Sequence, residues 1–151
     1  MRLLKNHCRS LCLSSVGLLI AWTTRGQEPY NRVYLDSATF TYAFYTTQDQ
    51  PKIKTGRSYT WYKAGRILTT VEGYDGLLLD GEYRMFYLNK SLYRQGNYKM
   101  GIRSGLWREW YANGQLKEKS VWEEGRLRGE PERFDSTGRP AAVRDTNIAK
   151  P

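Results

Sequence analysis

A unit of 24 residues repeats along this chain, and it constrains the fold more than any other feature. Gly81, Gly105 and Gly129 are spaced by 24 residues, so successive units begin at these positions. An earlier unit begins at Gly56 and is one residue longer, and the unit that begins at Gly129 stops early. The two complete units align Tyr83 with Trp107, Phe86 with Trp110, Tyr87 with Tyr111, Leu92 with Leu116, Tyr98 with Trp122, and Gly101 with Gly125. Such a period indicates a repeat protein, whose neighbouring units bury one another.

Each unit has the pattern of a β-hairpin. Asn113-Gly114 is a dipeptide favoured in two-residue type I′ turns, in which both central residues need positive φ. The equivalent positions hold Thr137-Gly138, Ala64-Gly65 and Asn89-Lys90. The spacings 101–105 and 125–129, each Gly-x-x-x-Gly, fit reverse turns between hairpins. We therefore predict an all-β fold, an elongated antiparallel sheet of consecutive hairpins over 56–138.

The two ends of the array differ from the repeat. Residues 27–55 contain strand-like segments at 31–36 and 39–47, although periodicity also allows a short helix over 37–45. We expect this part to be an N-terminal cap that covers the open edge of the first hairpin. At the other end, Pro131 indicates a final edge strand, because proline cannot donate to a ladder. Residues 139–151 are expected to form a flexible tail.

Residues 1–26 have the three parts of a secretory signal peptide. A positively charged start is followed by the uncharged apolar run 11–22 and by small residues before a cut ahead of Gln27. A short membrane anchor is the alternative, but a span needs about 20 apolar residues. Cys12 lies at the beginning of the run, so we expect no lipidation. The predicted location is the periplasm, the cell envelope or the extracellular space.

Removal of that segment takes away the one His and both Cys residues of the chain. The net charge falls from +9 to +5, because the segment holds four Lys and Arg residues and no acid. The mature chain has neither Cys nor His, so it offers no thiolate or imidazole for zinc or nucleophilic catalysis. The carboxylate pairs Asp75 with Asp80 and Glu123 with Glu124 fall in turns between units, where acids are expected. We predict a protein that is not an enzyme, with no catalytic residue, cofactor or metal.

The best unit reads Gly-x-Trp-x-x-Trp-Tyr-x-Asn-Gly-x-Leu and ends in Gly-x-x-x-Gly. This pattern resembles the bacterial variant of the MORN repeat, in proteins often labelled as YwqK-type antitoxins. The resemblance covers about 56–138 and is strongest over 95–129; Asn89-Lys90 departs from it by lacking the turn glycine. The motif positions are Gly105, Trp107, Trp110, Tyr111, Asn113, Gly114, Leu116, Gly125 and Gly129. The resemblance implies a hairpin-repeat sheet with a binding or scaffolding role, and its antitoxin label implies a toxin partner.

The alternation of side chains separates two faces of the expected sheet. Leu106, Arg108, Trp110 and Ala112 lie on one face, and Trp107, Glu109 and Tyr111 lie on the other. We predict that the shared core is the stripe Trp61, Phe86, Trp110 and Phe134. The opposite set is then a candidate binding surface, because one sheet cannot bury both faces alone. The candidate contact residues are Tyr62, Tyr87, Trp107 and Tyr111 of this opposite set, together with the neighbouring Arg84 and Arg108. The plain alternative is surface aromatics shielded by Lys and Arg stems.

These observations predict an exported binding or scaffolding protein whose partner is another macromolecule. A protein partner fits best, since Trp, Tyr and Arg are typical anchors of protein interfaces. A partner toxin, a cell-wall glycan and an anionic membrane surface remain alternatives. The positive charge is spread along the chain and no recognition motif is present, so we expect no nucleic-acid partner. The oligomeric state is left open.

Overall fold

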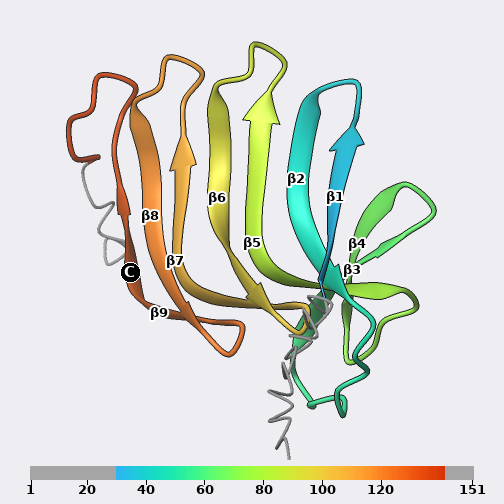
Figure 1. Cartoon of the computed structure of the whole chain (residues 1–151). Coiled ribbons are helices and arrows are strands. Elements are labelled where there is room, and N and C mark those ends of the chain that lie inside the picture. Colours follow the sequence, from blue (N-terminus) through green and yellow to red (C-terminus); the bar gives the residue numbers. More distant parts are fainter. Residues whose placement is uncertain (1–29, 142–151) are drawn as a thin grey trace, which may run out of the picture.

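The computed structural model describes residues 30–141, which form nine strands in one sheet (Figure 1). The strands are β1 (Tyr30–Asp36), β2 (Phe40–Thr47), β3 (Ser58–Lys63), β4 (Arg66–Val71), β5 (Leu77–Tyr87), β6 (Leu92–Lys99), β7 (Ile102–Trp110), β8 (Leu116–Glu123) and β9 (Arg126–Arg133). All neighbouring strands are antiparallel, as the hairpin pattern predicts, so the all-β fold is confirmed. Over the described range there is no helix that could cross a membrane. The predicted signal peptide, 1–26, lies outside the described residues.

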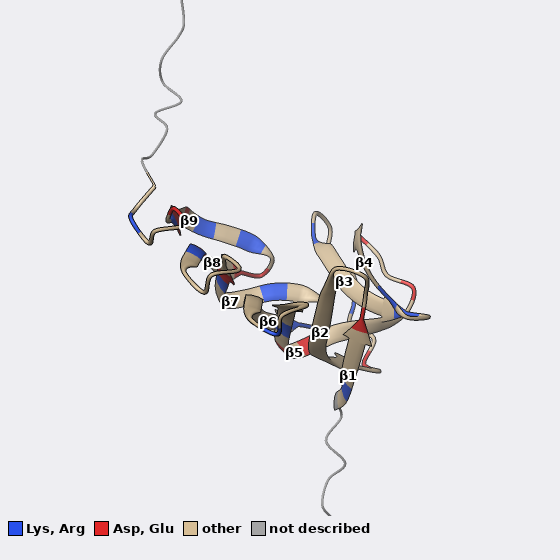
Figure 2. Cartoon of the chain, turned by 90° about the horizontal axis from the view of Figure 1, so that it is seen from above, with Lys and Arg blue, Asp and Glu red and all other residues tan. Residues whose placement is uncertain are grey.

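The strand order shows how the repeat array is extended at its N-terminal side. The main path is β1-β2-β5-β6-β7-β8-β9, so each repeat adds one hairpin to the row. The β3–β4 hairpin leaves this row, to one side in Figure 2, and meets β5 only at Trp61–Leu78 and Tyr62–Leu77. We expected this hairpin to be the first of the continuous array. Instead β2 pairs along most of β5, where it buries Phe44 to 1% exposure. β4 pairs with β3 alone, so the prediction that the N-terminal cap covers the open edge of the first hairpin is wrong.

The ends of the sheet also have defined neighbours. The segment 40–47 is a strand and not the helix that periodicity allowed. At the other end, β9 is the last strand of the row, and Pro131 lies in it between the paired residues Arg128 and Glu132. Residues just beyond β9 turn back: Pro140 forms a bridge with Phe134, and the Ala141 N–H donates to the Arg133 carbonyl at 2.8 Å. The rest of the predicted tail, from residue 142, lies outside the described part of the chain.

The turns are of two kinds, and one differs from the prediction. The Tyr111 N–H donates to the Gln115 carbonyl, and the Gly114 N–H donates to the Tyr111 carbonyl, which defines a three-residue loop. Only Gly114 has positive φ there (+85°), so a type I′ turn at Asn113-Gly114 was the wrong prediction. A type I turn followed by one left-handed residue gives this loop. The paired positive φ values that type I′ requires occur at Met100-Gly101, Glu124-Gly125 and Ala64-Gly65.

The glycines that open the repeat units form β-bulges. Gly81, Gly105 and Gly129 have φ of +97°, +68° and +66° within their strands. At each of these bulges, three residues of one strand lie opposite a single residue of its neighbour; these single residues are Tyr45, Gly96 and Ser120. Bulges with a left-handed glycine bend a strand and increase its twist. The 24-residue period therefore places the same bend in every second strand.

Two clusters make up the core. The larger contains Phe44, Leu79, Tyr83, Met85, Tyr98 and Trp107, and side chains from β1 and the β3–β4 hairpin pack against it. The smaller contains Tyr59, Trp61, Leu78 and Ile102 and joins β3 to the N-terminal ends of β5 and β7. Burial raises the pKa of the Tyr83 phenol well above its usual value, as expected for a core tyrosine.

Candidate functional site

One face of the array carries a row of polar side chains that crosses five strands. Arg84, Gln95, Arg108, Lys119 and Glu132 are successive cross-strand partners, from β5 to β9. Residues directly opposite each other in antiparallel strands point to the same face. We call this the outer face, and the opposite side, which carries Tyr83 and Trp107, the inner face. The repeat thus brings Arg84 and Arg108, predicted from the sequence, onto one surface.

Hydrogen bonds and ion pairs engage the charged side chains at both ends of the row but not the one at its centre, Arg108. Arg84 donates to the Glu82 carboxylate at 2.6 Å, and the Gln95 amide donates to the same carboxylate at 2.9 Å. At the other end Lys119 pairs with Glu132 at 2.8 Å. Arg108 is exposed and forms no ion pair with any residue in the described range. Its guanidinium is therefore available to a carboxylate of a partner.

Apolar side chains border this row on the outer face. Phe86 faces Leu92, and Trp110 faces Leu116, in each case across a hairpin near its tip. On the other side of the row, Leu106 faces Val121, which is 46% exposed. Phe86 and Trp110 are only half-buried and are absent from both core clusters. The prediction that they form the core stripe is therefore wrong, although Trp61 of the same set is buried in the smaller cluster.

Trp107 lies in the core, and its prediction as a partner contact is also wrong. It is 3% exposed, and its ring packs against Tyr98 and Tyr83 at centroid distances of 5.0 and 5.8 Å. Space for the indole comes from Gly96 on the neighbouring strand, where an added Cβ would lie 2.2 Å from the ring. The guanidinium of Arg103 covers it at 4.9 Å. The inner face is thus the buried one in this part of the sheet.

The three predicted tyrosines all form contacts within the fold. The Tyr87 hydroxyl donates to the Trp110 carbonyl at 3.0 Å, and the Tyr111 hydroxyl donates to the Phe134 carbonyl at 2.9 Å. Both bonds link a hairpin to the next one, 23 residues along the chain. Tyr62 packs edge-on against Phe44 at 5.5 Å. The repeated tyrosine therefore fixes neighbouring hairpins together, a role that its recurrence alone could have suggested.

We predict that Tyr111→Phe weakens the docking of the last hairpin without unfolding the chain. One hydrogen bond is lost while the ring remains, so the free energy of unfolding should fall by about 1 kcal/mol. Chemical denaturation followed by circular dichroism measures this loss. Tyr34→Phe is the matched control, since Tyr34 is exposed and its hydroxyl has no bond within the described residues. Equal stability of both variants would contradict the bracing role.

Elsewhere on the inner face, charged side chains satisfy one another. Arg94 contacts Glu109 at 2.6 Å, and Arg133 contacts Glu118 at 3.0 Å. Arg103 lies over both Trp107 and Trp122, each at 4.9 Å. These cations already have partners within the fold. The outer face, with its unpaired Arg108, is the better candidate for binding.

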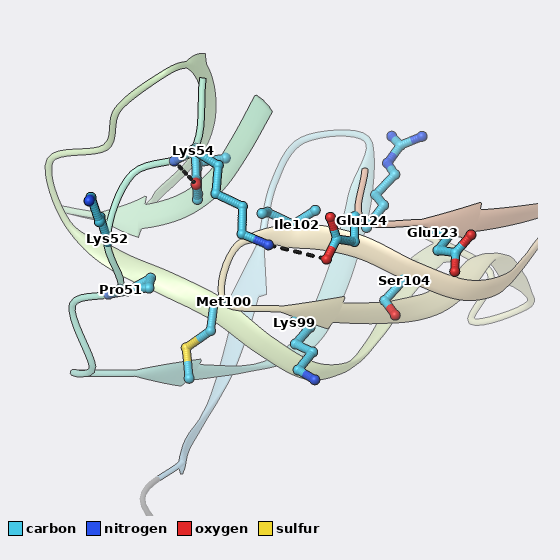
Figure 3. Close-up of a pocket in the computed structure, with 11 residues that line it drawn as sticks. Pro51, Lys52, Lys54, Lys99, Met100, Ile102, Ser104, Glu123 and Glu124 are labelled. Carbon is cyan, nitrogen blue, oxygen red and sulfur yellow. Dashed lines mark hydrogen bonds and ion pairs between the residues drawn. The ribbon is translucent and has the colours of Figure 1, made fainter. Parts of the chain in front are cut away.

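A pocket of about 320 Å³ lies at the lower edge of the sheet, between the loop before β3 and the turns after β6 and β8 (Figure 3). Lys54 reaches across it to Glu124 at 3.2 Å, and Arg57 approaches the same carboxylate at 3.6 Å. The hydrogen bond from Lys54 holds the pKa of Glu124 below its usual value. Because this carboxylate is occupied by the two cations, the pocket presents mixed charge and no defined chemistry.

The candidate carboxylate pairs do not converge on a reaction site. Glu123 pairs with Arg128 while Glu124 pairs with Lys54, so the two side chains serve different partners. Asp75 contacts Lys63 at 2.7 Å, whereas buried Asp80 accepts the Met100 N–H at 3.0 Å. Among residues 30–141, no group of three or more His, Cys, Asp or Glu side chains could hold a metal ion.

Comparison with known proteins identifies the repeat. Residues 79–100 and 103–124 each match the family model described as the MORN repeat variant. The two matches correspond to the β5–β6 and β7–β8 hairpins, which carry most of the outer face. No curated protein and no solved structure matches the chain. The match concerns the repeat and does not extend to the YwqK-type antitoxin label.

Proposed function

We propose that this chain, with its two repeats of the MORN variant, is an exported, non-enzymatic protein that binds another protein through its outer face. MORN repeats are commonly modules that bind proteins or membranes. The observation that carries the proposal is the row Arg84, Gln95, Arg108 and Lys119, bordered by half-buried aromatic side chains on an open sheet face. Export rests on the signal-like sequence of residues 1–26.

The composition of the outer face favours a protein over other macromolecules. Arg and Trp are enriched among the residues that dominate protein interfaces, and Arg108 and Trp110 lie two positions apart on the same face. An anionic membrane would be better served by a cluster of uncompensated cations. Here Glu82 and Glu132 neutralise both ends of the row. Because the row presents both positive and negative side chains on one sheet face, it suits a partner that also carries both charges.

The proposal predicts that a charge reversal at the centre of the row abolishes capture of the partner. Protein expressed from the full 151-residue sequence is immobilised and exposed to an envelope extract of the organism that encodes it. Arg108→Glu should weaken retention of the captured protein at least tenfold, or by about 1.4 kcal/mol. Lys52→Glu makes the same charge change in an exposed loop away from the outer face and should leave retention unchanged.

Trp110→Ala serves as a second variant, since it removes an apolar anchor and leaves the charge of the row intact. Circular dichroism and the melting temperature establish that each variant is folded. Two parallel assays use insoluble peptidoglycan and vesicles with anionic lipid. The proposal is contradicted if all variants capture the protein equally and if the chain is retained on peptidoglycan or on the vesicles to an extent that Arg108→Glu does not change. Capture of a protein encoded beside this gene, with toxic activity that the chain neutralises, supports the toxin-partner alternative.

A further inference from the structure

The β3–β4 hairpin ends in an open strand edge. β4 pairs with β3 alone, from Lys63–Arg66 at the turn to Ser58–Val71 at the far end. The two-residue turn Ala64-Gly65 makes Lys63–Arg66 a hydrogen-bonded pair, and the bond from the Glu72 N–H to the Arg57 carbonyl continues the same phase. Alternate residues therefore direct their N–H and C=O groups away from β3. These residues are Ile67, Thr69 and Val71, and no backbone partner for them exists within the described residues.

This edge lacks the features that protect the other two. β9 carries five charged residues and Pro131, and residues 139–141 turn back beside its C-terminal end. β1 carries Arg32 and Asp36. In contrast, the only charge in β4 is Arg66 at its turn end; Ile67 to Val71 hold neither charge nor proline, and Leu68 and Val71 are 38% and 68% exposed. Proteins usually block open edges with charges, proline or a covering segment, so an unprotected one is a template for a further strand.

A groove lies beside the start of this edge. Its volume is about 280 Å³; Arg66, Ile67 and Leu68 form one side, and Leu35, Asp36 and Tyr42 from the β1–β2 hairpin form the other. A strand added to β4 at the usual spacing between strands, roughly 4.7–4.9 Å, would run into this groove. Every second side chain of that strand would then face the apolar wall made by Leu35 and Ile67.

We propose that the β4 edge binds an extended segment of a partner protein as an added strand. Main-chain hydrogen bonds to Ile67, Thr69 and Val71 provide affinity, and apolar residues at alternate positions of the segment fill the groove. This binding site is separate from the outer face and goes beyond the function proposed for it.

The test uses a library of random 12-residue peptides displayed on phage, selected on protein expressed from the full sequence. Selected peptides should share apolar residues at alternate positions. Val71→Pro removes an outward N–H without touching the ladder to β3, so it should weaken binding of a selected peptide at least tenfold. Val71→Thr keeps that N–H and should bind like the unaltered protein. Arg108→Glu should also bind normally, which separates this site from the outer face.

Amide hydrogen exchange by NMR gives a second readout. In the free protein the amides of residues 67, 69 and 71 should exchange much faster than those of 66, 68 and 70, and the peptide should slow them at least tenfold. Thr69→Pro, which removes another outward N–H, is the alternative if Val71→Pro does not fold. The proposal is overturned if no peptide is enriched, if the proline variant binds equally well, or if those three amides stay unprotected in the complex.

Discussion

Replacement of Trp107 by alanine is expected to lower the free energy of unfolding by about 3–5 kcal/mol, which is a large part of the stability of a small domain. The side chain is 3% exposed and packs between the rings of Tyr83 and Tyr98 in the larger core cluster. Its loss leaves a cavity that the extended strands cannot close. Urea denaturation followed by tyrosine fluorescence measures the change.

Two comparison variants make this prediction specific. The Trp107 Nε1 is buried and has no hydrogen-bond partner in the described structure, so Trp107→Phe removes an unsatisfied donor along with some volume. We expect Trp107→Phe to cost much less than Trp107→Ala. Trp110→Ala, one of the outer-face variants, should cost less than half as much as Trp107→Ala, because Trp110 is half-exposed. If Trp110→Ala were the more destabilising variant, the core would lie on the outer face and not on the inner one.

The second large effect is expected at Gly96, where the indole of Trp107 lies against the backbone. A Cβ at this position would lie 2.2 to 2.7 Å from three ring atoms, closer than any packed carbon atoms approach. Gly96→Ala should therefore destabilise the protein by about 3 kcal/mol, at the upper end of the usual range for overpacking. Gly73→Ala is the matched control, since an added Cβ there meets nothing within 4 Å and φ is not positive. Thermal and urea unfolding of the two variants check the difference.

The two changes should also be coupled. When Trp107 is already alanine, the ring that Gly96→Ala would strike is absent, so the second substitution should cost little. Neighbouring residues that share a cavity show such non-additivity, whereas distant ones add. Strict additivity in the double variant would show that the ring of Trp107 does not lie on Gly96.

The sequence was informative about the hairpins because each repeat contains its own turn and alternation. The 24-residue period correctly places the hairpins β5–β6 and β7–β8, and Pro131 correctly indicates an edge strand. The type of turn at Asn113-Gly114 was not predicted, because a three-residue loop uses the same glycine in one left-handed position. Turn dipeptides therefore locate a hairpin more reliably than they define its geometry.

The buried face could not be deduced from one repeat, because both faces carry aromatic side chains. Which face is buried depends on β2, whose Phe44 lies opposite Tyr83, and on Gly96, which makes space for Trp107. One signal was present in the sequence: Gly96 and Ser120, which share an offset in successive units, are both small. Both lie beside Trp107, since its ring lies against Gly96 and Ser120 is its cross-strand partner. The departure of β3–β4 from the row likewise depends on β2, which lies outside the repeat.

The most direct test of the proposed function is a chemical footprint of the complex with the captured protein. Lysines are acylated and arginines are modified in the free protein and in the complex, and mass spectrometry gives the extent at each site. We expect at least fivefold protection at Arg108 and Lys119 and unchanged reactivity at Lys52 and Lys99, which lie by the pocket at the lower edge. Full reactivity of Arg108 and Lys119 in a complex that protects other sites would contradict binding through the outer face.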